Sequence, residues 1–99
     1  MTGNLFRIRE GKLDQWRAWC ARISGELRTD ATTSIVEEKT LQELFVIFEV
    51  GGTHYTIGLA EGECLPPTDR DINTEHRRIS RECLEKIGPI ELAYHLKAL

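Results

Sequence analysis

The hydrophobic pattern is most regular between residues 72 and 87, where side chains that can pack in a core recur every three or four positions. This spacing predicts a helix that carries them on one face. The face holds Ile72, His76, Ile79, Cys83 and Ile87. Asp71 or Asn73 can cap the start of this helix, since a short polar side chain accepts hydrogen bonds from free amides. Gly88-Pro89 is predicted to end it, because proline cannot continue a helix.

From residue 90 the period changes to two, which predicts a last strand over residues 90–96. One side of this strand would be apolar, with Ile90, Leu92, Tyr94 and Leu96. The other side would hold Glu91, Ala93 and His95. The sequence therefore places one histidine on an apolar helix face and another on the polar side of a strand.

The first half of the chain predicts a strand and a helix. Residues 4–9 alternate and indicate a strand with Phe6 and Ile8 on one side. A helix follows from about Lys12, because apolar side chains then step by three and four. Residues 29–39 favour a broken or kinked continuation of that helix, since TDATTS has low helix propensity. The segment from Ile35 onward fits either a resumed helix or the start of a strand.

A hairpin is predicted in the middle of the chain. Residues 41–50 form a strand that is apolar on both faces, so neither face is expected to be fully wet. Gly51-Gly52 is typical of a two-residue turn, which needs positive φ angles. Residues 53–60 pair back, with Tyr55, Ile57 and Leu59 on one side. Two prolines then make residues 61–71 a loop.

This order predicts an α+β fold, a single domain over residues 1–99 with ferredoxin-like split β-α-β (βαββαβ) topology. Right-handed crossovers would place two helices on one face of a four-stranded antiparallel sheet. The second sheet face keeps apolar positions, which a second copy of the chain can cover. We therefore expect a homodimer that packs through the sheet face, a dimeric α+β barrel.

The block INTEHRRISRECLEKIGPIELAYHL also resembles the C-terminal signature of a small family of unknown function in the ferredoxin-like dimeric α+β-barrel superfamily. The positions that carry the likeness are Ile72, Asn73, Glu75, His76, Cys83, Leu84, Glu85, Glu91, Leu92, Tyr94 and His95. The segment KLDQWRAW, with Lys12 and Trp16, is similar to that family's first helix. The resemblance covers about a third of the chain well, implies a ferredoxin-like homodimer and implies no particular reaction.

Composition narrows the classes of partner. The formal charge is −3, and no basic run exceeds two residues, which argues against nucleic-acid binding. No apolar run approaches the length of a membrane span, and no signal peptide is recognised, so we expect a cytoplasmic protein with no membrane partner. The odd number of cysteines, three, argues for reduced thiols. Cys20 and Cys83 fall on apolar helix faces, where a thiol is usually inert.

The first candidate site uses polar side chains of neighbouring strands. If Phe6, Ile8, Tyr55, Ile57 and Leu59 face the helices, the opposite face presents a group of polar side chains. This group comprises Arg7, Arg9, His54, Thr56, Glu91 and His95. An arginine, a carboxylate and two imidazoles could bind an anionic or polar small molecule, or supply acid–base catalysis. The alternative is that Arg7 and Glu91 form an ion pair and His95 a dimer contact.

The second candidate is His76, which would be a catalytic base in a cleft or a buried imidazole held by a backbone carbonyl or by Glu38. Trp19 is the aromatic residue expected to line a pocket. No phosphate loop, serine elbow, zinc spacing or calcium loop is present, so we expect neither a cofactor nor a metal site.

Two functions fit these residues. One is a cofactor-independent enzyme or a binder of a small polar or anionic molecule. For this first function, His76 and His95 would be the catalytic residues. The residues that bind the ligand would be Arg7, His54, Glu91 and Trp19. The other is a non-catalytic dimerisation, structural or regulatory module without a small-molecule site.

Overall fold

A four-stranded antiparallel sheet and three helices make up the fold in the computed structural model, which describes residues 1–98. In chain order the elements are β1 (Thr2–Ile8), α1 (Leu13–Ser24), α2 (Arg28–Glu37), β2 (Thr40–Val50), β3 (Thr53–Gly62), α3 (Asp71–Cys83) and β4 (Leu84–Pro89). The strands lie in the order β2-β3-β1-β4, and each neighbouring pair is antiparallel. The predicted α+β class, the antiparallel sheet and the glycine hairpin between β2 and β3 are confirmed.

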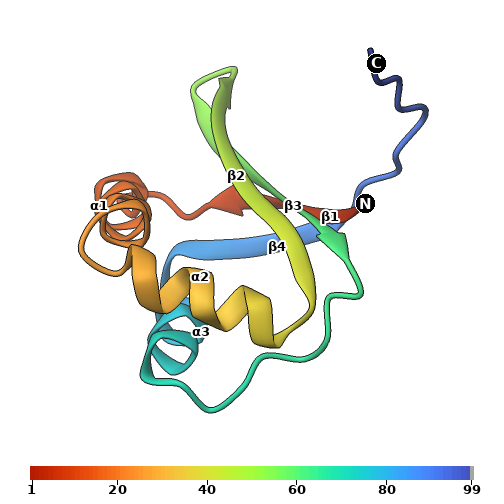
Figure 1. Cartoon of the computed structure of the whole chain (residues 1–99). Coiled ribbons are helices and arrows are strands. Elements are labelled where there is room, and N and C mark those ends of the chain that lie inside the picture. The colour runs from red at the N-terminus through yellow and green to blue at the C-terminus, as the bar shows by residue number, and fades with distance from the viewer. Residues whose placement is uncertain (99) are drawn as a thin grey trace.

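All three helices lie on the same side of the sheet (Figure 1). The buried core between the layers consists of Ile8, Trp16, Trp19, Ile79, Cys83 and Leu84. Trp16 of α1 packs edge-on against Phe45 of β2, with ring centroids 5.7 Å apart. Phe6 and Ile8 face this core, as the alternation in β1 predicts. The amphipathic face of α3 is also as predicted, since Ile79 and Cys83 are buried.

The helical segment after β1 is divided in two, so the prediction of two helices was wrong. α1 ends at Ser24, and α2 begins at Arg28. The amides of Gly25 and Leu27 both donate to the carbonyl of Arg22, which closes the first helix before the chain turns into the second. The predicted break in this segment is thus present. The arrangement is compatible with a ferredoxin-like fold only loosely, because its element order contains the additional helix α2.

The C-terminal boundary differs most from the prediction. The helix ends at Cys83 rather than Ile87, and the last strand is Leu84–Pro89 rather than residues 90–96. Leu84 pairs with Ile8 and is buried, so tertiary packing overrides the helical pattern of this segment. Residues 90–98 form neither helix nor strand, because the edge of β1 where they were expected to pair is already occupied by β4.

The side-chain orientation predicted for β3 was also wrong. Ile57 was expected to face the helices, but it is Thr56 that is fully buried beneath them. Ile57 lies between Val46 of β2 and Leu5 of β1 in the sheet. The ring of Phe45 covers Gly58, and a Cβ atom built on Gly58 would lie 2.5 Å from that ring. The helical layer therefore needs small side chains on the inner side of β3. Its larger apolar side chains, including Tyr55 and Leu59, consequently lie on the outer face.

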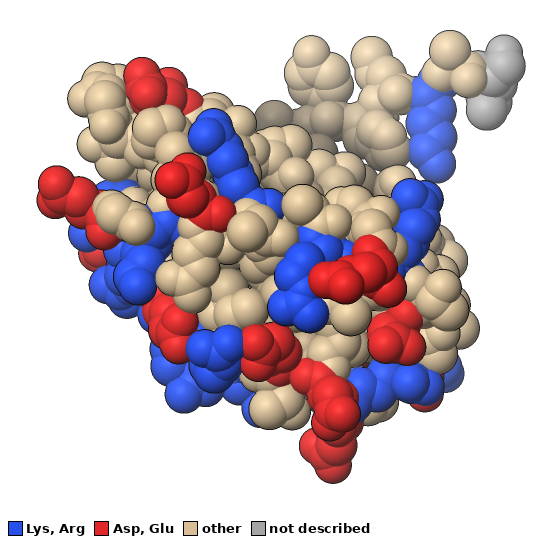
Figure 2. Space-filling view, turned by 90° about the vertical axis from the view of Figure 1, so that its left-hand side faces the viewer, with Lys and Arg blue, Asp and Glu red and all other residues tan. Residues whose placement is uncertain are grey.

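The outer face of the sheet is accordingly rich in apolar side chains. On β2, four alternate positions point away from the helices and are exposed: Leu44, Val46, Phe48 and Val50. The surface at the α1 end of the molecule is different, because acidic and basic side chains intersperse there (Figure 2). Within residues 1–98, no helix is both long enough and apolar enough to cross a bilayer.

Candidate functional site

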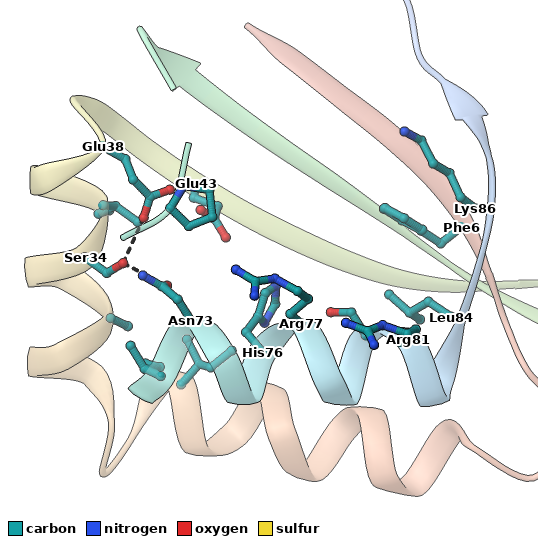
Figure 3. Close-up of a pocket in the computed structure, with 16 residues that line it drawn as sticks. Phe6, Ser34, Glu38, Glu43, Asn73, His76, Arg77, Arg81, Leu84 and Lys86 are labelled. Carbon is teal, nitrogen blue, oxygen red and sulfur yellow. Dashed lines mark hydrogen bonds between the residues drawn. The ribbon is translucent and has the colours of Figure 1, made fainter. Parts of the chain in front are cut away.

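A cavity of about 530 Å³ lies between α2, α3 and the inner side of the sheet (Figure 3). We call it the main cavity. Its apolar walls come from Phe6, Ile23, Ile35, Ile72 and Leu84. Polar side chains reach it from α2, α3, β2 and β4. An apolar hollow with a few convergent polar groups is the usual form of a small-molecule site.

Opposite charges lie at the two ends of the main cavity. Glu38 and Glu43 are at the α2 end, Arg77 lies near the middle, and Arg81 and Lys86 are toward the other end (Figure 3). Within residues 1–98, none of these three cations forms an ion pair. They are exposed at the rim. Their charges are therefore available to an anionic group at the mouth of the cavity.

A buried hydroxyl connects α2 with the start of α3. Ser34 is 2% exposed, and its Oγ atom lies 2.8 Å from Oε2 of Glu38 and 2.9 Å from Oδ1 of Asn73. The hydroxyl has one proton, so it donates to one of these acceptors at a time. The Nδ2 atom of Asn73 donates to the carbonyl of Thr68 at 3.1 Å, which fixes its amide orientation. These bonds hold the acidic end of the cavity in place.

His76 of α3 lies between the main cavity and the core. Its Nδ1 atom accepts a hydrogen bond from Nε1 of Trp19 at 2.9 Å. An indole nitrogen can only donate, so Nδ1 carries no proton, and the neutral ring has its proton on Nε2. Burial lowers the pKa of His76, which favours this neutral form. The tryptophan thus makes the Nε2–H group of His76 a hydrogen-bond donor.

Glu43 of β2 lies at the boundary between the main cavity and a second hollow. Withdrawal of its carboxyl group from water raises its pKa above the ordinary value, and the negative charge of Glu38 raises it further. Its side chain nevertheless keeps contact with solvent, since the residue is exposed as a whole. A carboxyl group of this kind holds a proton more readily than an isolated glutamate.

The second hollow has a volume of about 420 Å³ and lies beside the main cavity. The two share wall residues, among them Ile35, Glu43 and His76. Trp16 and Phe45 form the aromatic part of its wall. The Nε1 atom of Trp16 is buried and has no hydrogen-bond acceptor among the described residues. We call this hollow the aromatic subcavity.

The residues proposed from the sequence are distributed over three places. His76 lines the main cavity, and Trp19 lies behind it in the core, 2% exposed. Arg7 and His54 line a smaller hollow at the end of β1, away from His76. Arg7 is paired there with Glu85, and Nε2 of His54 lies 3.2 Å from Oε2 of Glu49.

Glu91 and His95 are both exposed in the segment after β4. They were expected on a strand beside Arg7, and the expected Arg7–Glu91 pair was wrong because Glu85 occupies that position in the sheet. The strand-face site predicted from the sequence is therefore not assembled in the single chain. The physical cause is the six-residue displacement of the last strand from residues 90–96 to Leu84–Pro89.

Several cavity residues were not identified from the sequence, including Ser34, Glu43 and Arg81. Ser34 is one hydroxyl in a segment rich in threonine, and only the fold shows that it alone is buried there. Arg77 and Arg81 are four residues apart on α3 and therefore share a face, which was a usable signal. Arg78, between them, is paired with Glu75 and Glu82 on the surface.

Fold and cavity together define the class: a small α+β domain with an open, charged hollow between its sheet and its helices. Comparisons of the chain with models of protein families, with curated proteins and with solved structures found no match. Among the described residues, no cluster of three or more histidine, cysteine or acidic side chains could hold a metal ion.

Proposed function

We propose that this chain binds a small organic molecule with an anionic group in the main cavity. One observation carries the proposal: within residues 1–98, Arg77, Arg81 and Lys86 have no carboxylate partner, and they lie at the rim of a cavity whose walls are largely apolar. The anionic group would lie at this rim, where guanidinium groups can contact it in a bidentate manner. The apolar body of the ligand would contact the side chains of Phe6, Ile72 and Leu84.

Phenyl phosphate is a suitable probe, with benzyl alcohol as the uncharged comparison. We expect phenyl phosphate to shift the backbone amide signals of the cavity residues in a ¹H–¹⁵N correlation spectrum, and benzyl alcohol to shift them less. An Arg77→Gln/Arg81→Gln double variant should bind phenyl phosphate about tenfold or more weakly, because each charge-assisted hydrogen bond contributes about 1.5–3 kcal/mol. Arg17→Gln, on the exposed side of α1, is the control. Equal affinities for the two probes, or equal losses in both variants, would contradict the proposal.

Catalysis is a second reading of the same cavity, and His76 and Glu43 are the residues that favour it. The Nε2–H group of His76 would donate to a developing oxyanion rather than act as a base, since Trp19 occupies Nδ1. Glu43 would supply or accept the proton. The test is a Glu43→Gln variant with a compound that the unmodified chain converts. Binding of this compound without its conversion would support catalysis, whereas an unchanged turnover number would contradict it.

We also propose that two copies of the chain pack through the outer face of the sheet, with the strand order of a ferredoxin-like domain and α2 as an added helix. The support is the exposed apolar row on β2, which runs from Leu44 to Val50. Surface patches of this kind are commonly contacts between proteins. Light scattering at micromolar concentration should give twice the mass of the chain. A monomeric mass would contradict this proposal and leave the cavity proposal intact.

A further inference from the structure

Among the side-chain nitrogen and oxygen atoms of residues 1–98, the indole nitrogen of Trp16 is the one that is buried without a hydrogen-bond partner. Trp16 is 0% exposed, and its Nε1–H group has no acceptor within residues 1–98. A buried donor without an acceptor costs about 1–3 kcal/mol in folding free energy. The other tryptophan, Trp19, donates to His76. The two indole groups lie on the same helix, α1, and among the described residues only that of Trp16 is left without a partner.

The indole of Trp16 is accompanied by a second donor. Trp16 and His76 both line the aromatic subcavity, with ring centroids 6.2 Å apart. Because Nδ1 of His76 accepts from Trp19, its remaining nitrogen, Nε2, carries the proton. This nitrogen forms no hydrogen bond among the described residues and belongs to a ring that lines both cavities. Two side chains that line this wall thus carry an N–H group without an acceptor among the described residues, and one of these groups, Trp16 Nε1–H, is buried.

We propose that the aromatic subcavity is the subsite for an uncharged hydrogen-bond acceptor of the ligand, a carbonyl oxygen above all, held by Trp16 Nε1–H and by His76 Nε2–H. This inference rests on the proposed function, because the anionic group of the same molecule would lie at the rim of the main cavity. The two cavities share Glu43 and His76 as wall residues, so one molecule can extend from the rim into the subsite.

The surroundings favour an uncharged acceptor over an anion. Phe45 and the neutral ring of His76 lie next to Trp16, and the Phe45 and His76 ring centroids are 6.2 Å apart. Arg28 also lines the hollow, but it is exposed. Moving an anion into such a site without a buried counter-charge costs far more than moving a carbonyl group, which two donors can satisfy.

The test uses two probes of nearly equal shape, acetophenone and α-methylstyrene, in which a carbonyl oxygen is replaced by a methylene group. The chain has two tryptophans, so its ¹H–¹⁵N spectrum contains two indole signals. Trp19→Phe removes one of them and thereby assigns both, and a nuclear Overhauser effect to the ring of Phe45 identifies Trp16 where that variant does not fold. Before any probe is added, the Trp16 indole proton should resonate upfield of the hydrogen-bonded Trp19 proton.

We expect acetophenone to shift the Trp16 indole proton downfield and α-methylstyrene not to do so. Trp16→Phe should weaken acetophenone binding about threefold to tenfold, the loss expected for one neutral hydrogen bond. Its effect on α-methylstyrene should be smaller. Equal responses to the two probes, or a Trp16 proton that is already as far downfield as that of Trp19, would overturn the inference. If phenyl phosphate still binds in that case, the subsite fails while the proposed function stands.

Discussion

At the scale of single residues, the tautomer of His76 is decided by one neighbour. Trp19 can donate and cannot accept, so it keeps the proton of the imidazole on the other ring nitrogen, Nε2. The helical spacing of His76, Ile79 and Cys83 was enough to place the histidine on the buried face. It could not show which group would meet the ring, because Trp19 lies 57 residues away in sequence.

Replacing His76 by phenylalanine should lower the free energy of unfolding by about 1–3 kcal/mol, since the buried Trp19 Nε1–H group then loses its acceptor. In a Trp19→Phe background the same replacement should cost clearly less, because no donor is left unsatisfied. Urea unfolding of the four proteins of this double-mutant cycle measures the difference. Equal costs in both backgrounds would mean that the bond contributes nothing.

Stability should also depend on pH through His76. Burial holds its folded-state pKa below the ordinary value of 6.5, so the unfolded chain takes up the proton first as the pH falls. The free energy of unfolding should therefore decrease from about pH 6.5 downward. His76→Gln should reduce the dependence of the free energy of unfolding on pH. His95→Gln, in the exposed C-terminal segment, should leave this dependence unchanged. Urea unfolding between pH 5 and 8 would check this, and an unchanged slope in His76→Gln would contradict it.

At the scale of elements, the border between α3 and β4 shows how packing overrides local pattern. The residues LEKI continue the helical spacing, yet Leu84 leaves the helix with extended backbone angles and pairs with Ile8. The amide of Arg9 donates to the carbonyl of Cys83 at 2.8 Å and fixes this junction. Ile87, expected on the helix face, is 53% exposed on the strand.

The segment after β4 should be dispensable for the fold of one chain. A chain that ends at Ile90 keeps the hydrogen bond from its amide to the carbonyl of Gly3 and every strand of the sheet. Its free energy of unfolding should stay within about 0.5 kcal/mol of the full chain, as is usual for changes at exposed positions. A chain that ends at Cys83 lacks β4 and should not fold. A large loss of stability in the chain that ends at Ile90 would show that residues 91–99 stabilise the fold.

The contact between β2 and β3 makes a matched pair of glycine substitutions informative. Gly58→Ala would bring a methyl group to within 2.5 Å of the Phe45 ring, whereas a methyl group at Gly88 meets nothing within 4 Å. We expect Gly58→Ala to destabilise the protein by about 1–3 kcal/mol, the usual cost of overpacking. Gly88→Ala should be close to neutral. Thermal unfolding of the two variants would compare them, and similar melting temperatures would contradict this packing.

At the scale of the whole molecule, the two faces of the sheet have different roles. The inner face holds the core and the cavities, and the outer face exposes an apolar row on β2. Val46 is 44% exposed in this row. If two copies pack through this face, Val46→Lys should convert a dimer into a folded monomer, because buried unpaired charge is costly. Ala18→Lys, on the exposed side of α1, should remain dimeric. Sedimentation velocity would distinguish them, and a dimeric Val46→Lys protein would contradict the proposed contact.

The sequence by itself determined what depends on near neighbours: the α+β class, the hairpin at Gly51-Gly52, the break between α1 and α2, and the buried face of α3. These follow from side-chain period and turn chemistry, which act over a few residues. Only the tertiary structure decided which six residues form the last strand beside β1 and which side of β3 faces the helices. It also decided that Ser34, Glu43, His76 and the rim arginines share one cavity. Those outcomes depend on competition for one strand edge and on the room left beside Phe45, and both are set by contacts between residues distant in sequence.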